Sequence, residues 1–228
     1  MYSPTPMHAA HLELGFGLAT NGDQTARQLG GVGRVAVPAF LGLRAEGEFF
    51  ALVNSSDEAA ATAYGFVSHL YKDAPTHALG AFAGVSVYQN TIAYIIGGEA
   101  KLYLGPLALT GVAGGMLPEG SGSGIYAFHG AADYYFTPDH KLSLKLNYFL
   151  PSDSSSENVW SVGGRIEKRF TGTEWGLFAD TSYLTAGGDY VWSGRIGFRT
   201  FFDAPGTTLQ QHEREVPFDV TSVTNFAR

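Results

Sequence analysis

The residues with the most evident chemistry are charged side chains spaced two positions apart, such as Glu99 and Lys101, or Arg165, Glu167 and Arg169. A period of two places side chains on one face of a β-strand. Such a face can line a water-filled passage, or its charges can pair across a closed interior. We predict that these side chains point into one shared interior: Arg44, Glu46, Glu48, Glu99, Lys101, Asp133, Lys141, Lys145, Arg165, Glu167, Arg169, Asp180, Arg195 and Arg199.

The seven histidines do not indicate an active site. A serine hydrolase needs a serine beside a histidine and an acid, and the sequence contains no Gly-x-Ser-x-Gly motif. His69 and His129 fall on the inward phase of their strands without such partners. His8 and His11 are spaced like metal ligands but lack a third ligand. We therefore predict no catalytic residue, metal or cofactor, and keep a lipid-modifying enzyme as the least favoured alternative.

Residues 125–150 show best which elements position the inward charges. Leu142, Leu144 and Leu146 alternate with polar residues, so one face of a strand is apolar and the other polar. A second alternating segment precedes it, and the two are joined by a compact turn at 137–140 that contains proline and aspartate. Strands of this length match the roughly 9 to 11 tilted residues that cross a bilayer.

Composition supports an all-β chain. Charged residues are 15%, aromatic residues 14%, and glycines number 30, a mixture that favours strands and tight turns over helices. No apolar run approaches the roughly 18 residues of a transmembrane helix. The net charge of −7 argues against nucleic acid as a partner, and the absence of cysteine excludes disulfides and thiol chemistry.

The rest of the chain repeats the same hairpin. We predict a transmembrane, antiparallel up-and-down β-barrel of about twelve strands, with tight turns at one end and mostly longer polar loops at the other, apart from a short turn near residue 90. The barrel should cover residues 11–202, after a lead-in at 1–10 and before a tail at 203–228. One tight turn is expected at 37–39, with the next strand beginning at Phe40.

Large aromatic residues concentrate near the predicted strand ends, on the apolar phase. Outer-membrane barrels carry rings of such residues at the level of the lipid headgroups, whereas a soluble β-sandwich would bury them near strand centres. We predict two aromatic girdles, which contain Tyr148, Trp160, Phe170, Trp175, Tyr183, Tyr190, Trp192 and Phe202.

The last predicted strand, at 190–202, ends in aromatic residues, and its part 194–202 resembles the closing strand of the outer-membrane β-barrel families of Gram-negative bacteria, both porin-like and OmpA-like. The resemblance covers 11–202 and implies the cell outer membrane as location, with contact to its lipid and insertion by the barrel assembly machinery. It also implies that the short turns and both termini are periplasmic. The chain departs from these families by continuing beyond Phe202.

Two functions remain open from the sequence. The inward phase can line a small porin-like channel for passive diffusion of solutes or ions, and many inward glycines and alanines favour open space. Its basic side chains on the strands near 141–145, 165–169 and 195–199 would then favour anions. Alternatively, inward charges pair with one another in a structural or interaction barrel.

The tail at 203–228 is not part of the predicted barrel, so we consider its role separately. Its segment 209–215 is polar and lacks the apolar stripe of a stable helix. Phe218, Val220 and Phe226 are expected to anchor the tail, either as a periplasmic plug in the barrel or on a partner chain, including a second copy. We favour the partner, because an apolar strip suits another protein better than a charged lumen.

Overall fold

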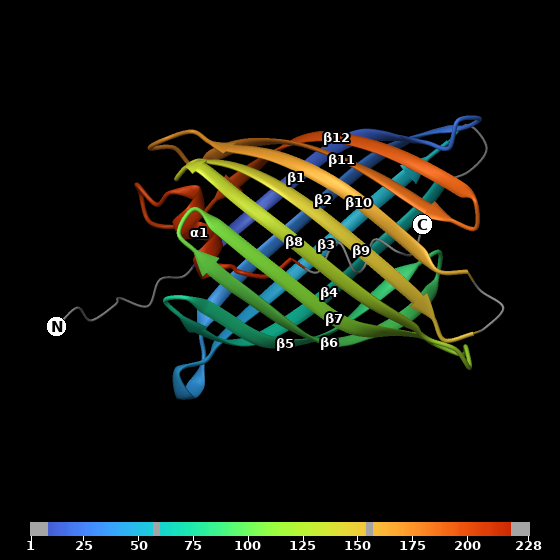
Figure 1. The fold of residues 1–228 in the computed structure, drawn as a ribbon, viewed down its shortest axis with the longest axis horizontal. Coiled ribbons are helices and arrows are strands. Elements are labelled where there is room, and N and C mark those ends of the chain that lie inside the picture. The colour runs from blue at the N-terminus through green and yellow to red at the C-terminus, as the bar shows by residue number, and fades with distance from the viewer. Residues whose placement is uncertain (1–8, 57–59, 154–156, 220–228) are drawn as a thin grey trace.

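The computed structural model describes residues 9–56, 60–153 and 157–219, and within these ranges it contains a closed antiparallel barrel of twelve strands (Figure 1). Each strand pairs with its neighbours in sequence, which is the up-and-down topology expected from the hairpin repeats. The strands are β1 Ala9–Thr20, β2 Thr25–Pro38, β3 Arg44–Ser55, β4 Ala60–Ala74, β5 His77–Tyr88, β6 Thr91–Leu104, β7 Leu107–Pro118, β8 Ile125–Thr137, β9 His140–Pro151, β10 Val159–Arg169, β11 Trp175–Ala186 and β12 Asp189–Phe201.

The barrel closes by pairing β1 with β12, in a register that places Leu14 opposite Phe198 and Glu13 opposite Arg199. We call the end where β1 begins and β12 finishes the turn end, and the opposite end the loop end. Closure leaves no unpaired strand edge, which a bilayer requires because lipid cannot satisfy backbone hydrogen-bonding groups.

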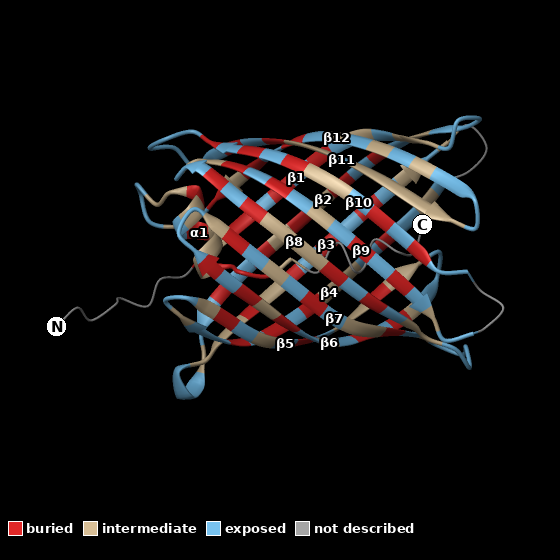
Figure 2. Cartoon of the chain, in the orientation of Figure 1, coloured by how far each residue is buried: buried red, intermediate tan, exposed pale blue. Residues whose placement is uncertain are grey.

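Side chains alternate between the inside and the outside along every strand, as the banding of buried and exposed residues in Figure 2 shows. On β9, Leu142, Leu144 and Leu146 are exposed on the outer face, whereas Lys141 and Ser143 are buried inside. The outer surface is therefore apolar and the inner surface carries the charges. The described residues contain no helix long and apolar enough to cross a membrane.

The first tight turn lies further along the chain than expected. β2 continues through Pro38, and the reversal is a short 3-10 turn at Phe40–Gly42 rather than at 37–39. Leu41 takes a left-handed conformation with φ of 56°, and the amide of Ala39 donates to the carbonyl of Leu43 at 2.8 Å. Phe40 therefore cannot start β3, although the inward and outward phases of that strand are as predicted.

Two loops at the loop end are shorter than expected. Thr20 pairs with Thr25 across the first of them, and Ala186 pairs with Asp189 across the last. Polar segments that the sequence assigns to loops thus extend the strands, because ladder hydrogen bonds continue until the chain must reverse.

Aromatic rings fill much of the space that inward glycines leave. The ring of Phe50 lies over Gly65 so closely that a Cβ at that glycine would approach its Cε1 to 2.7 Å, and Phe82 covers Gly114 in the same way. Phe50 and Phe82 belong to a buried apolar cluster on the inner face, with Ile95 among its other members. The glycines therefore admit rings rather than open space, and part of the lumen is hydrophobic.

After β12, the chain turns back into the barrel. Residues 203–208 lead to helix α1 Leu209–Glu215, which lies at the turn end (Figure 1), and residues 216–219 follow it. The helix contradicts the sequence expectation for 209–215. It begins with a capping box between Thr208 and Gln211, and the barrel buries Leu209 and His212, so tertiary contacts supply what an apolar stripe would.

Candidate functional site

The structure places every charged residue predicted to face the interior on the inner side of the barrel. Most of these side chains are buried, including Glu46, Glu48, Glu99, Lys101, Asp133, Lys141, Arg165, Glu167, Arg169 and Arg199. Arg44, Lys145, Asp180 and Arg195 remain partly exposed. The charges thus meet in a largely filled interior rather than along an open wall.

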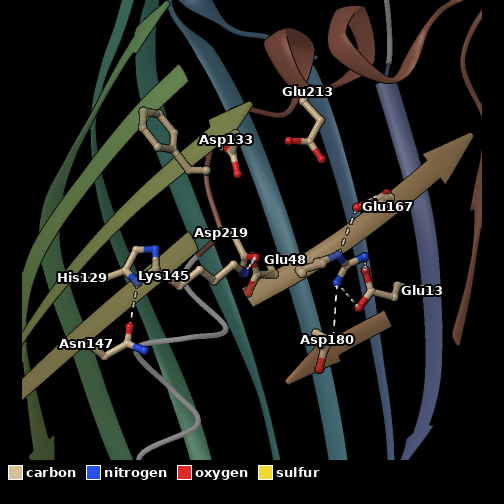
Figure 3. Close-up of polar contacts among 12 residues, drawn as sticks. Glu13, Glu48, His129, Asp133, Lys145, Asn147, Glu167, Asp180, Glu213 and Asp219 are labelled. Carbon is tan, nitrogen blue, oxygen red and sulfur yellow. Dashed lines mark hydrogen bonds and ion pairs between the residues drawn. The ribbon is translucent and has the colours of Figure 1, made fainter. Parts of the chain in front are cut away.

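One network forms around Arg165 of β10. Its guanidinium donates to both carboxylate oxygens of Glu13 at 3.0 and 2.7 Å, and to Glu167 at 3.0 Å. Arg199 contacts the same two acids at 2.9 and 2.7 Å, and Asp180 lies 3.8 Å from Arg165. Figure 3 shows Glu13, Glu167 and Asp180 grouped at this network. Because β1 and β12 are neighbours in the closed barrel, Glu13 neutralises much of the basic surface that the sequence suggests would favour anions.

The second network binds the tail to the wall through Glu213 of α1. Its Oε1 accepts from Lys141 at 2.6 Å and from Arg199 at 3.0 Å, while Tyr135 donates to Oε2 at 3.3 Å. The Glu213 side chain is only 13% exposed, and these cations hold the pKa of its carboxyl well below the usual range although burial opposes them. A glutamate supplied by the tail therefore completes the charge balance of the barrel wall.

Deeper in the lumen, residues 216–219 follow the helix and contact strands on different sides of the inner wall. Lys101 donates to the carbonyl of Pro217 at 3.1 Å, and Arg34 donates to the carbonyl of Phe218 at 2.9 Å. The carboxylate of Asp219 lies 2.8 Å from Arg34 on β2 and 3.2 Å from Lys145 on β9. This single aspartate bridges opposite sides of the lumen.

Phe218 lies in an aromatic pocket inside the barrel and is fully buried. Its ring stacks on His69 at a centroid distance of 6.4 Å and meets Tyr71 edge-on at 5.5 Å. This is the position expected of a plug, not of an anchor on a partner chain. The charged lumen thus contains an apolar site that the sequence does not reveal. The other two predicted anchors, Val220 and Phe226, lie outside the described residues.

A chain of buried polar groups fastens the tail near the turn end. Arg169 donates to both oxygens of Asp203 at 2.9 and 2.8 Å, Asp203 lies 2.8 Å from Nδ1 of His212, and Nε2 of His212 lies 2.8 Å from Nδ1 of His11. Burial lowers the pKa of His212. For Asp203, burial acts to raise the pKa, but the hydrogen bonds with His212 and Arg169 outweigh it and lower the value.

Beyond Asp219, toward the loop end, the described residues line a cavity of about 360 Å³. Its lining includes basic side chains such as Arg34 and Arg195, acidic ones such as Asp180, and the apolar rings of Phe50 and Phe149. The cavity therefore has an amphipathic lining.

The predicted girdle residues lie on the outer face near the strand ends, and all are exposed except the half-buried Tyr183. At the loop end, the ring of Tyr183 contacts Trp160, Tyr190 and Trp192 at centroid distances of 5.8, 6.2 and 4.8 Å. At the turn end, Trp175 contacts Phe198 at 6.1 Å. These clusters place amphipathic rings at the two rims of the apolar surface.

Sequence reasoning missed the groups that join the tail to the wall, namely His11, Asp203, His212 and Glu213. Asp203 lies directly after the closing strand, and the first turn of α1 carries a capping pattern at Thr208 and Gln211, so a helix signal was present. Nothing in the spacing of Asp203 and His212 indicates that they meet β10 and β1.

No protein-family model matches this sequence. No curated protein matches it either. Among solved structures, the COG4313 outer membrane channel from Pseudomonas putida F1 superposes with a TM-score of 0.66 at 13% identity, covering 88% of this chain and 97% of that one.

Two porins are also similar. The KdgM porin in complex with disordered oligogalacturonate gives a TM-score of 0.62 at 10% identity, and the NanC porin gives 0.61 at 12%. Each match covers 83% of this chain and 98% of the other. The fold is therefore that of bacterial outer-membrane channels and porins.

Proposed function

We propose that this chain is an outer-membrane channel for passive diffusion of small solutes or ions, and that its own C-terminal segment obstructs the lumen. In this arrangement the apolar outer surface faces lipid and the two aromatic girdles lie at the headgroups. The turn end and both termini lie in the periplasm, and the barrel assembly machinery inserts the chain. We further propose that the protein has no enzymatic activity.

The observation that carries this proposal is the position of residues 209–219 across the lumen. These residues are joined to the barrel wall by non-covalent contacts that can break without unfolding the strands, chiefly ion pairs to Lys141 and Arg34. Removing them would leave basic side chains on the wall with fewer acidic partners, in the part of the barrel that leads to the loop-end cavity. A channel closed by a docked segment accounts for both the charged wall and the added acids of the tail.

Single-channel recording in planar bilayers tests the proposal. The full chain and a variant that ends at Phe202 would be compared after both are shown to migrate as heat-modifiable, folded barrels. We expect the full chain to conduct rarely or in brief openings and the truncated chain to conduct steadily. A truncated barrel that is folded and silent would contradict a channel function.

One observation favours the alternative of a structural barrel. Glu13, Arg165, Glu167 and Arg199 form ion pairs between wall residues, and they do not need the tail. If these contacts alone close the lumen, both proteins in the conductance experiment will be silent. Association of the full chain with a second copy or with another protein, lost on truncation, would then support an interaction barrel.

A further inference from the structure

Glu46 and Glu48 of β3 and His69 of β4 converge on the inner face of the barrel. Their separation in sequence hides this, but the strand register places Glu46 directly opposite His69. One carboxylate oxygen from each glutamate and one ring nitrogen of the histidine all lie within 4.8 Å of one another. Carboxylate oxygens and imidazole nitrogens together are ligands typical of zinc and of neighbouring divalent metals.

Two of these side chains have donor or acceptor atoms without a hydrogen-bond partner among the described residues. Both oxygens of Glu46 lack one, and so does Nε2 of His69. Each residue is only 2% exposed. Buried polar atoms are rarely left unpaired, because losing water without a replacement costs about 1–3 kcal/mol, and more for a charged group. The unpaired atoms therefore indicate a ligand that binds between them.

The other nitrogen of the His69 ring is already oriented. Nδ1 lies 3.0 Å from both carboxylate oxygens of Glu99, which reaches from β6 across β5. Gly80 of β5 makes this reach possible, since a Cβ at that position would lie 2.8 Å from Oε1 of Glu99. Metal-bound histidines commonly have this arrangement, in which a carboxylate accepts from one ring nitrogen and so orients the other toward the metal.

The local charge points to a cation. Glu46, Glu48 and Glu99 are all buried, and Glu48 lies 2.9 Å from the guanidinium of Arg34. Arg34 also pairs with Asp219 at 2.8 Å, so its charge is shared. Burying several carboxylates around one shared positive charge is costly, and a divalent cation would offset that cost.

We infer that Glu46, Glu48 and His69 form a binding site for one divalent transition metal ion, with zinc as its best-fitting occupant and Glu99 as the residue that positions the histidine. Ligands of tetrahedral zinc lie about 2.0–2.2 Å from the ion, so the three donors would move closer together on binding. Phe218 stacks on the His69 ring, which places this site directly beneath the docked tail. Metal binding and tail docking should therefore influence each other.

The test uses the full chain, purified in detergent, stripped with chelator and dialysed against Zn²⁺ or Co²⁺. We expect one zinc ion per chain. Glu46→Gln and His69→Gln should weaken binding by about 100-fold or more, and Glu99→Gln by about 10- to 100-fold. His129→Gln is the matched control, because His129 is a buried lumen histidine that binds Asn147 instead, at 2.6 Å. His212→Gln tests whether zinc binds instead at the histidine pair near the turn end.

Each outcome decides the proposal. Binding that disappears in Glu46→Gln and His69→Gln while these variants still migrate as folded barrels supports the site. Wild-type protein that binds no more zinc than Glu46→Gln, or binding that is lost in His212→Gln instead, overturns it. If the ligand variants do not fold, X-ray absorption of the zinc-loaded wild type decides: one imidazole with carboxylate oxygens supports the site, and two or more imidazoles refute it.

Discussion

Replacement of Glu213 by glutamine should release the tail from the lumen. Glu213 brings the one negative charge of α1 that Lys141 and Arg199 both contact, at 2.6 and 3.0 Å. Glutamine keeps the shape of the side chain and can still accept hydrogen bonds, so the variant removes charge rather than packing. Removing one partner of a buried ion pair typically costs about 3–5 kcal/mol.

The expected cost here is smaller, because both cations keep another acid. Lys141 lies 3.5 Å from Glu167, and Arg199 lies 2.7 Å from it. We therefore expect docking of the tail to weaken by about 2 kcal/mol, midway in the range for hydrogen bonds to charged groups. That corresponds to about a 30-fold rise in the population with a released tail.

Two measurements check this value. A released tail should expose Arg214 to trypsin. When release and docking are fast compared with cleavage, the cleavage rate follows the fraction of molecules with a released tail. The cleavage rate of Glu213→Gln should therefore be about 30-fold higher than that of the wild type. Single-channel recordings should show longer or more frequent openings. Glu119→Gln, at an exposed position in the β7–β8 loop, is the matched control and should resemble wild type. If Glu213→Gln is folded but cleaved and gated like wild type, the ion pairs do not hold the tail.

Three further outcomes follow from the structure. Leu144→Arg should block insertion into liposomes far more than Lys145→Leu, because only the first places a charge in lipid, at about 2–4 kcal/mol; equal folding yields would refute the assigned outer face. Acid should release the tail, since docking lowers the pKa of His212 and Asp203, so the docked state binds fewer protons; conductance should rise as pH falls below about 6.5, and His212→Asn should flatten this response. Deleting 203–228 removes tail acids that face the basic wall, so the truncated barrel should prefer anions, and cation selectivity from reversal potentials would contradict this.

The strands and their two faces were predictable because each follows from local periodicity. Leu144 and Lys145 show their orientation within a few residues of sequence, whatever the rest of the chain does. The turn at Phe40–Gly42 was not predictable, because Leu41 adopts a left-handed conformation that usually requires glycine or asparagine.

The side-chain contacts in the lumen depend on the register between strands and on the closure of the barrel, and the alternation of residues along one strand predicts neither. Glu46 and Glu48 are visibly on one face, but His69 joins them only through the pairing of β3 with β4. The sequence favoured Phe218 as an anchor on a partner chain over a plug, yet Tyr71 and His69 form an aromatic pocket for it in the lumen that no single strand reveals.

The fastening of the tail also has a consequence for the order of assembly. His212 contacts His11 at the start of β1, while Asp203 follows the end of β12, so the docking site exists only after the first and last strands have paired. That pairing joins the most distant parts of the chain and is expected to form late. Protection of Arg214 from protease should therefore appear after the hairpins form, which makes it a time marker for the final step of barrel assembly.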